Sequence, residues 1–506
     1  MVPRFCSAAL VLQVGQNFTS ATYSTDSAAL PPDASLGVSS NHIVEFINGR
    51  YSVFSKTNST KLQTKTDLSF WASAGITNIP VLGVTDPRVV FDSASQRWFA
   101  SMVDIPSSEI SNRFLLAVST NADPTSTWKA VGFTADPVNG FFADFPTMGI
   151  DANGVYLAGD MSDAIGNNTG SVLVSIPKSA LLANPPSAAG RTSFGVLSYN
   201  NYGVILQPVI TIGAATSPEV VCSVGDLGYD GLSHSTLLGA TIQNAGSPGG
   251  ASLTIATTIP VPQYSIPPLP AQPGAENIDD GDTRFSGVIF RVGNTIYATH
   301  STDVNNRAAI QWFKIDALTL GLIETGLITD PVRDLYYPAI AADTNGTVII
   351  VFNASGPTNF VSAYAVLGER INGALSFGNF VLLKSGVAAY RTNSTVTRWG
   401  DYSALTPDPS NPGHYWALTM FPSSSTGWST QISELITTPV LLSIHTSSTN
   451  IVLTWPLAAF GYQLQSSPSL SPANWTLVPQ VPATNNSQLT LSLGATNVSR
   501  LFRLKK

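Results

Sequence analysis

Aspartate recurs in this sequence at the start of short apolar segments, where it could take part in acid–base chemistry. Asp86, Asp144, Asp282 and Asp401 each stand at such a position and are the candidate catalytic residues. A pair of carboxyl groups can act as general acid and base in the cleavage of a glycosidic bond. An aspartate at a turn can instead accept backbone hydrogen bonds and hold strands together. The recurrence favours this structural role for each aspartate, and both interpretations stay open.

Arginine and aromatic residues accompany these aspartates. Arginine binds carboxylate groups through two parallel hydrogen bonds, and aromatic side chains offer a broad apolar face with which a sugar ring could stack. The candidate ligand-binding residues are Arg88, Arg284, Arg333, Tyr337, Arg398, Trp399 and Tyr402. In RWGDYSALTPDP, residues 398–409, the pair Arg398 and Trp399 is not reproduced in the other segments. We therefore expect a site there first, with packing between strands as the alternative for the aromatic residues.

One acidic turn could bind a metal ion. NIDDGDTR, residues 277–284, places Asp279, Asp280 and Asp282 around a glycine, and Ca²⁺ prefers such oxygen ligands. The spacing is not that of an EF-hand loop, so a solvated acidic turn is the alternative. The five histidines lack the short spacing of a zinc site. The sequence indicates no other cofactor.

The composition limits the classes of function. Charged residues make up 11% of the 506 residues, against about 25% in a typical soluble protein. The net charge is −7 and no Lys/Arg run is present, so the basic patch of a nucleic-acid-binding protein is missing. No apolar run reaches the ~18 residues that span a bilayer. We expect no nucleic-acid partner and no membrane span, and we expect a monomer.

The first residues bear on localisation. MVPRFCSAALVLQV resembles a signal peptide that lacks most of its basic end. We therefore interpret residues 1–12 as a signal-peptide remnant and expect a secreted or cell-surface protein. A misassigned start or a first β-strand is the alternative.

The elements that must position the candidate residues are β-strands. Short alternating runs bounded by Gly, Asn and Asp recur along the chain, as in strands and hairpins. They repeat at intervals of roughly 50 to 75 residues, the spacing of propeller blades. The repeats start at Leu36, Asp86, Asp144, Gln207, Asp282, Tyr337 and Asp401. This pattern predicts an all-β fold with a seven-bladed β-propeller over residues 13–437, whose first strands begin at one end of the central channel.

Three further segments complete the predicted architecture. The seventh repeat lacks one strand, so we expect LQVGQNFTS to close the ring as its outer strand. The proline-rich segment 259–274 is expected to be an extended crossover, because proline cannot donate ladder hydrogen bonds. Residues 440–506 contain about six short alternating strands and are expected to form a small β-sandwich.

Several segments resemble known protein modules. DPRVVFDSASQRWF, AVSTNADPTSTWKAV, DFPTMGIDANGVYL and RWGDYSALTPDP resemble blades of secreted bacterial propeller proteins of the sialidase-like, Asp-box superfamily. The C-terminal LTWP, YQLQSSPSL, NWTLV and RLFRLKK resemble fibronectin-III-like modules. The two resemblances cover nearly the whole chain. They imply a fold more firmly than an activity, because the superfamily includes sialidases, other glycosidases, lyases, lectins and proteins without known activity.

The motifs of this superfamily are incomplete here. The Asp-box turn occurs only between Ser119 and Trp128, with stretched spacing. In the superfamily that turn is structural and remote from the active site. The resemblance to sialidases also implies a tyrosine activated by a glutamate. Glu45 is the one glutamate on an expected inner strand, and no tyrosine of the repeat accompanies it. The catalytic set of sialidases therefore cannot be transferred to this chain.

These observations favour an exported binding or surface-interaction protein with an extracellular glycan as ligand at the channel mouth. One alternative is a carbohydrate-active enzyme, a glycoside hydrolase or polysaccharide lyase, that uses the same acidic mouth. Another is an adhesion or scaffold protein that uses the propeller rim and has no channel site. Two unpaired carboxyl groups facing one open pocket would favour the enzyme, whereas aspartates bonded only to turns would argue against it.

Overall fold

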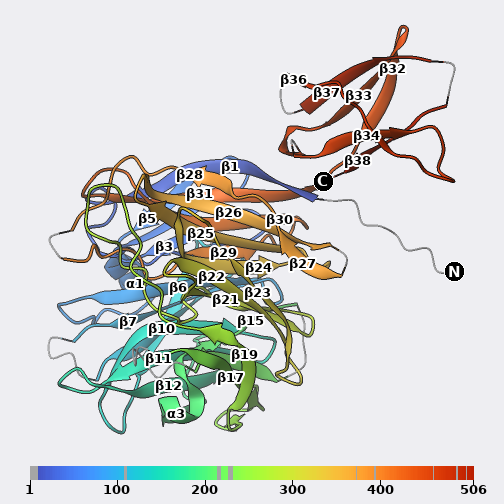
Figure 1. Cartoon of the computed structure of the whole chain (residues 1–506). Helices are drawn as coiled ribbons and strands as arrows, with labels where there is room; N and C mark the ends of the chain where they lie inside the picture. The colour runs from blue at the N-terminus through green and yellow to red at the C-terminus, as the bar shows by residue number, and fades with distance from the viewer. Residues whose placement is uncertain are drawn as a thin grey trace. The chain divides into compact units, whose positions relative to one another are not determined.

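The computed structural model describes residues 10–106, 111–213, 218–225, 232–371, 373–392, 395–459, 461–485, 488–496 and 499–505. Nearly all regular structure in these residues is β-strand, which confirms the all-β prediction (Figure 1). The helices described are short: α1 (Asp67–Ser73), α2 (Lys178–Leu181), α3 (Tyr199–Tyr202) and the 3-10 helix η1 (Leu457–Ala459). None of them has the length and apolar character needed to cross a bilayer. The chain divides into two compact units, Gly15–Glu434 and Met1–Val14 with Leu435–Lys506.

The larger unit consists of successive antiparallel meanders, which we number one to seven. Meander one contains β2 (Ser35–Val38), β3 (His42–Ile47), β4 (Arg50–Ser55) and β5 (Lys61–Lys65). Meander two contains β6 (Val84–Asp92), β7 (Arg97–Asp104), β8 (Arg113–Ser119) and β9 (Trp128–Thr134). Meander three contains β10 (Phe142–Ile150), β11 (Gly154–Ser162), β12 (Asn168–Pro177) and β13 (Thr192–Leu197).

The later meanders are similar but less regular. Meander four contains β14 (Val204–Pro208), β16 (Glu219–Val224) and β17 (His234–Gln243), with both β18 (Ser252–Leu253) and β19 (Thr257–Tyr264) paired to β17. Meander five contains β20 (Phe290–Val292), β21 (Thr295–Asp303), β22 (Ala308–Asp316) and β23 (Leu322–Ile328). Meander six contains β24 (Asp334–Ala342), β25 (Val348–Gly356) and β26 (Asn359–Ile371), with β27 (Ala374–Phe377) and β28 (Val381–Lys384) both paired to β26.

Meander seven combines the two ends of the larger unit. It contains β29 (Ala404–Pro407), β30 (His414–Pro422) and β31 (Trp428–Pro439), and β1 (Leu10–Thr22) pairs with β31 as its fourth strand. This confirms the prediction that the segment around LQVGQNFTS completes the last repeat. Glu45 of β3 strengthens the closure, because its Oε1 accepts hydrogen bonds from Ser20 Oγ (2.7 Å) and Thr430 Oγ1 (2.6 Å).

The first strands of the meanders contact one another in a closed circle. The order is β2, β6, β10, β14, β20, β24, β29 and back to β2, with the contact from β14 to β20 made by the short β15 (Ile210–Ile212). This strand follows β14 after Val209 and pairs in parallel with both β10 and β20. Because the starts of these first strands lie along one circle, residues far apart in sequence meet at one end of it.

The proline-rich segment contains more ladder pairing than predicted. Its first residues belong to β19, which is antiparallel to β17 with Pro260 opposite Thr236. Proline is tolerated in an edge strand, where its missing N–H can face away from the ladder. Residues 265–289 then follow with a single isolated bridge, from Ile278 to Thr397.

The smaller unit contains two described sheets. One has the order β32 (Ser443–Ser447), β33 (Asn450–Pro456), β37 (Gln488–Gly494) and β36 (Ala483–Asn485). The other has the order β35 (Thr476–Leu477), β34 (Gln463–Ser467) and β38 (Leu501–Lys505). Leu453, Trp455, Leu464 and Leu491 are buried in one core that both sheets share. Residues 1–9 lie outside the described residues, so the signal-peptide remnant over 1–12 stays a prediction, and residues 10–12 belong to β1.

Candidate functional site

Four first strands carry a bulge close to their start. The pairing register shifts between Thr85 and Arg88, between Asp144 and Thr147, between Val204 and Gln207, and between Tyr336 and Ala339. Within these bulges the backbone φ is positive at Asp86 (60°), Phe145 (47°), Ile205 (52°) and Tyr337 (48°). Positive φ in a residue other than glycine costs about 1–3 kcal/mol and is concentrated at functional sites. A bulge also changes the direction of nearby side chains, and here the bulges lie at one end of the circle.

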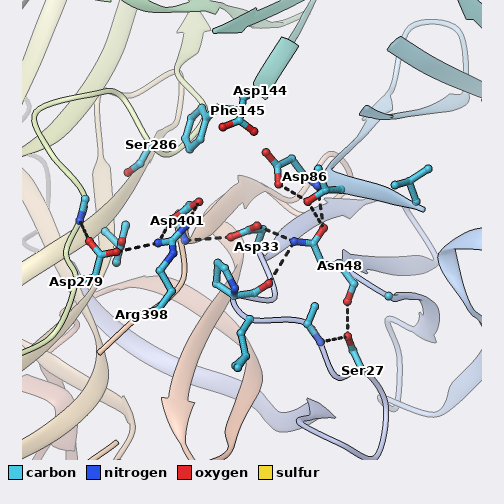
Figure 2. Close-up of a pocket in the computed structure, with 18 of the residues that line it drawn as sticks. Ser27, Asp33, Asn48, Asp86, Asp144, Phe145, Asp279, Ser286, Arg398 and Asp401 are labelled. Carbon is cyan, nitrogen blue, oxygen red and sulfur yellow. Dashed lines mark hydrogen bonds and ion pairs between the residues drawn. The ribbon is translucent and has the colours of Figure 1, made fainter. Parts of the chain in front are cut away.

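A cavity of about 690 Å³ opens at this end, and we call it the mouth cavity (Figure 2). Most of its charged lining residues are acidic. The carboxyl groups are those of Asp33, Asp67, Asp86, Asp144, Asp279, Asp280, Asp282 and Asp401, and the guanidinium groups are those of Arg284 and Arg398. Asn48, Ser286 and Tyr337 contribute further polar groups. The cavity therefore offers many hydrogen-bonding groups and a net negative charge.

The mouth cavity brings together most of the residues that the sequence singled out. These are Asp86, Asp144, Asp279, Asp280, Asp282, Arg284, Tyr337, Arg398 and Asp401. They come from meanders two, three and six and from the loops before β20 and β29. Their convergence agrees with the expected placement of the first strands, whereas their roles stay predictions.

Two of the predicted ligand-binding residues pack against each other away from this cavity. Arg88 is 3% exposed, and its guanidinium centre lies 3.6 Å from the ring centroid of Tyr402. Arg88 Nε donates to the carbonyl of Pro146 (2.8 Å), and the Tyr402 hydroxyl donates to the carbonyl of Pro87 (3.2 Å). A buried guanidinium needs such partners to offset its lost hydration. We therefore correct the prediction: this pair joins β6 to the segment just before β29 and does not line the mouth cavity.

Trp399 and Arg333 are also placed elsewhere. Trp399 is 1% exposed and donates its Nε1 hydrogen to Asn353 Oδ1 (3.1 Å). Arg333 pairs with Asp330 (2.7 Å) and lies over the ring of Tyr364 (4.8 Å). The large aromatic rings fill the space between meanders, because burial of their apolar area is worth more there than at an open mouth. The predicted stacking of Trp399 on a sugar ring is not supported.

Arg398 and Asp401 form the central ion pair of the site. Arg398 Nη1 lies 2.5 Å from Asp401 Oδ1, and Arg398 Nη2 lies 2.8 Å from Asp401 Oδ2. Nη1 also reaches Asp279 Oδ2 at 3.1 Å. The bridge between Ile278 and Thr397 positions this contact, because Asp279 N donates to the Thr397 carbonyl (2.9 Å). Figure 2 shows this chain of ion pairs along one wall of the cavity.

Arg284 is engaged in the same way by Asp282. Its Nε lies 2.9 Å and 2.8 Å from the two carboxylate oxygens of Asp282, and its Nη2 lies 2.5 Å from Asp282 Oδ2. The guanidinium also lies over the ring of Phe145, at 4.7 Å. Asp282 and Asp401, two of the four candidate catalytic residues, therefore serve as partners of arginine.

The geometry does not support the predicted Ca²⁺ site. Among the described residues, no group of three His, Cys, Asp or Glu side chains is placed to hold a metal ion. Asp282 turns to Arg284 and Asp279 to Arg398, so the acidic turn does not converge on one point. Asp280 is 2% exposed, and neither carboxylate oxygen has a hydrogen-bond partner in the described part of the chain. Burial raises the pKa of Asp280 well above its usual value, and Asp279 adds to the effect.

Asp33 and Asn48 are site residues that the sequence analysis missed. Asn48 Nδ2 donates to Asp33 Oδ2 (2.7 Å), and Asn48 Oδ1 accepts from the backbone N–H of Asp86 (2.8 Å). Asp33 Oδ1 in turn accepts from the backbone N–H of Asp401 (3.1 Å). These bonds connect meanders one, two and seven. Asp33 lies just before β2 with φ of 50°, so its position at a first strand was the signal that could have identified it.

Asp86 and Asp144 are the candidate catalytic residues that pair with no arginine in the part of the chain that the structure describes. Burial raises the pKa of Asp86 to about 7, and the neighbouring Asp144 carboxylate contributes. Asp86 Oδ1 accepts from Thr85 Oγ1 (2.7 Å). Asp144 is exposed to the cavity, yet the surrounding protein raises its pKa; the Phe145 amide opposes this shift, and Asp401 adds to it. Figure 2 shows both carboxyl groups directed toward the same part of the cavity.

Neighbouring carboxyl groups raise one another's pKa, because ionisation of one disfavours ionisation of the next. The pKa of the buried Asp33 is also raised, first by burial and then by Asp401 and Asp86. The pKa values of Asp33, Asp86 and Asp144 are therefore all raised, and Asp86, at about 7, is the group that keeps a proton closest to neutral pH. A carboxyl group that titrates near pH 7 can donate a proton to a leaving group, and one that is ionised can activate water.

Comparisons with known proteins identify no family. No family model matches the sequence, and no curated protein matches it. Among solved structures, the chain is similar to a GH43 endo-arabinanase from Bacillus licheniformis (13% identity, TM-score 0.31, 69% of this chain and 97% of that one). It is also similar to the Dos1 propeller (7%, 0.41, 84% and 95%) and to Trypanosoma rangeli sialidase (9%, 0.35, 82% and 60%). All three TM-scores lie below 0.5, and the strand pairing described above is the evidence for the fold.

Proposed function

We propose that residues 15–434 form a seven-bladed β-propeller whose central channel opens into the mouth cavity. Each meander then corresponds to one blade, and β1 closes the ring on β31. The closed circle of first strands supports this proposal, because a propeller places the innermost strand of every blade around one channel. Residues 440–506 are proposed to be a fibronectin-III-like sandwich, supported by two sheets that share one core.

We propose that the protein is a glycoside hydrolase that acts at the mouth cavity. The observation that carries the proposal is the pair Asp86 and Asp144, which face one cavity without an arginine partner. Hydrolysis of a glycosidic bond requires two carboxyl groups with different protonation states. Asp86, whose pKa is about 7, is assigned as the general acid. Asp144, which is open to the cavity, is assigned as the base or nucleophile.

The remaining groups of the cavity fit a substrate rich in hydroxyl groups. Carboxylates accept hydrogen bonds from sugar hydroxyls, and Asn48 and Ser286 add neutral polar groups to the lining. Asn48 is a positioning residue, because it fixes Asp33 and the backbone of Asp86 without reaching the reacting atoms. A volume of about 690 Å³ lies within the usual range for small-molecule sites.

Sialidase-type and lyase-type reactions are less well supported. Both act on carboxylated sugars, and an arginine that recognises such a sugar needs a free pair of N–H donors. The two cavity arginines direct N–H groups at Asp401 and at Asp282. Glu45, the one expected inner glutamate, is fully buried and lies outside the cavity lining.

Glycan binding without hydrolysis is a second candidate, and one observation favours it. Two of the four candidate catalytic aspartates are fixed by arginine, as expected of groups that shape a binding surface. Against this, the predicted stacking residues Trp399 and Tyr402 are buried. In either case we propose a secreted or cell-surface protein that acts on extracellular glycans, with the C-terminal unit as an accessory module.

The experiment that tests hydrolysis is a screen of oligosaccharides and polysaccharides, with the products identified by chromatography and mass spectrometry. We expect the wild-type protein to release products, and Asp86→Asn and Asp144→Asn to lose about 10²- to 10⁴-fold in rate. Asp163→Asn is the matched control, because Asp163 lies in an exposed turn between β11 and β12. Glycan binding without release of product by the wild-type protein would favour the second candidate. Equal rates in all variants would contradict the assigned residues.

A further inference from the structure

The charge balance of the mouth cavity indicates the class of sugar that it binds. Among the described residues, eight aspartates and two arginines line the cavity, and no lysine or histidine belongs to the lining. Both arginines direct N–H groups at neighbouring aspartates, at Asp401 and Asp279 for Arg398 and at Asp282 for Arg284. The ion pairs offset the positive charge of the arginines, so a bound ligand meets more carboxyl groups than guanidinium groups.

One wall of the cavity also holds two buried polar groups without a partner. Neither carboxylate oxygen of Asp280 has a hydrogen-bond partner in the described residues, and the same holds for the hydroxyl of Tyr337. The two residues are 2% and 3% exposed, and both line the cavity. Buried polar groups are rarely left unsatisfied, because each costs about 1–3 kcal/mol. These groups therefore indicate a ligand that donates hydrogen bonds at this wall.

Gly281 allows the wall to take this form. It has φ of 75°, and a Cβ atom at this position would lie 3.3 Å from Cε1 of Tyr337. The tyrosine ring therefore packs directly over the backbone between Asp280 and Asp282. This close approach places the hydroxyl of Tyr337 and the carboxyl of Asp280 on the same side of the cavity as Asp279, at the end of the ion-pair chain from Asp401.

We propose that the sugar bound in the mouth cavity carries a protonated amino group, which lies at the wall formed by Asp280 and Tyr337. An ammonium group has three N–H donors and one positive charge, and its approach would favour the ionised form of Asp280. It therefore matches the carboxyl group of Asp280 and the hydroxyl of Tyr337, which both lack partners among the described residues. The substrate class is then an oligomer of a 2-amino-2-deoxy sugar with free amino groups. This inference rests on the proposed function for the choice of a sugar, but its test measures binding and not hydrolysis.

The test is calorimetric binding of three matched oligosaccharides to the Asp144→Asn variant, in which turnover is removed. The ligands are a glucosamine oligomer, its N-acetylated form and a glucose oligomer of equal length. We expect the glucosamine oligomer to bind at least about tenfold more tightly than the other two at low salt, and the preference to shrink as salt screens the charges. Equal affinity for the three ligands, a preference for a neutral one or no binding of any would overturn the proposal.

Second-site variants locate the amino group. In the Asp144→Asn background, Asp280→Asn and Tyr337→Phe keep the size of each side chain, and we expect each to reduce the preference for the amine by about tenfold. Asp163→Asn is the control and is expected to leave the preference for the amine unchanged. Retention of the full preference in both variants would overturn the assignment to this wall. If the wild-type protein hydrolyses no substrate but the preference for the amine is present, the proposed reaction is contradicted and this inference still holds.

Discussion

Arg398 binds Asp401 through both of its terminal nitrogens, at 2.5 Å and 2.8 Å, at the mouth of the circle of first strands. The pair appears in the sequence as a cluster of charge that could be catalytic. In the structure, Asp401 neutralises the arginine, and its backbone N–H is held by Asp33. The pair therefore shapes the cavity, and the proposed acid–base chemistry is assigned to Asp86 and Asp144.

Asp401→Asn is expected to lower stability modestly. The substitution leaves residue 401 with one side-chain acceptor for Arg398, in addition to the acceptor on Asp279, and breaks the two-point contact. Because Arg398 is 40% exposed and solvent screens the pair, we expect a loss of only about 1 kcal/mol in the free energy of unfolding. Chemical denaturation of the two proteins measures the difference. A loss of several kcal/mol would mean that the pair is a main support of the fold, contrary to this interpretation.

Asn48→Ala is expected to destabilise the protein more strongly. It removes the donor to the buried Asp33 and the acceptor for the Asp86 backbone. Loss of partners for buried polar groups costs about 1–3 kcal/mol each. Asn345→Ala, in an exposed turn before β25, is the matched control and is expected to change little. Similar denaturation midpoints for the two variants would contradict the positioning role of Asn48.

Stability is expected to fall as the pH rises through neutrality. The folded-state pKa of Asp86, about 7, lies above its ordinary value of 3.8. A carboxyl group whose pKa is raised by folding contributes stability that is fully present below the unfolded-state pKa and is lost as pH rises through the folded-state pKa. We therefore expect a higher Tm at pH 5 than at pH 8.

Asp86→Asn separates this contribution from the others. The pKa values of Asp33, Glu219 and Asp280 are also raised by burial, so some decline with pH is expected to remain in the variant. The difference in Tm between pH 5 and pH 8 should be smaller than in the wild-type protein. An unchanged difference would show that Asp86 is not among the groups responsible.

Glu45 tests the closure of the ring. Glu45→Ala removes the acceptor shared by Ser20 and Thr430 and is expected to cost about 1–3 kcal/mol. Glu45→Gln keeps a carbonyl oxygen at that position and is expected to cost less. Hydrogen exchange supplies the local measurement: the amides of residues 15–22 should exchange faster in Glu45→Ala than in Glu45→Gln. Equal protection in both would mean that closure does not depend on this residue.

The sequence predicted the repeat because similar residue types occur at the start of several first strands. Asp86, Asp144 and Tyr337 precede or begin apolar segments of comparable length, and Asn-Gly turns such as Asn48-Gly49 mark the hairpins. Counting the expected strands of each repeat showed that the seventh lacks one, and β1 supplies this strand in meander seven. These features are local in the sequence, and the closed ring then follows from the number of repeats.

The site was less predictable because it depends on the direction of side chains. The bulges at Asp86 and Tyr337 change which side chains face the cavity. The alternation of side chains along a regular strand does not predict this change. Arg88 is two residues from Asp86 but turns to Tyr402 instead. Asn48 lies in a hairpin of meander one, and only the folded ring brings it to Asp86.

The central claim is that Asp86 and Asp144 form a coupled pair with a proton to donate near neutral pH. The most direct measurement is an NMR titration of ¹³C-labelled aspartate carboxyl groups in the wild-type protein, Asp86→Asn and Asp144→Asn. We predict a resonance that titrates near pH 7, that is absent in Asp86→Asn, and that shifts to lower pKa in Asp144→Asn because a neighbouring negative charge is removed. If Asp86→Asn loses only a resonance that titrates at the ordinary pKa of about 4, the claim is contradicted.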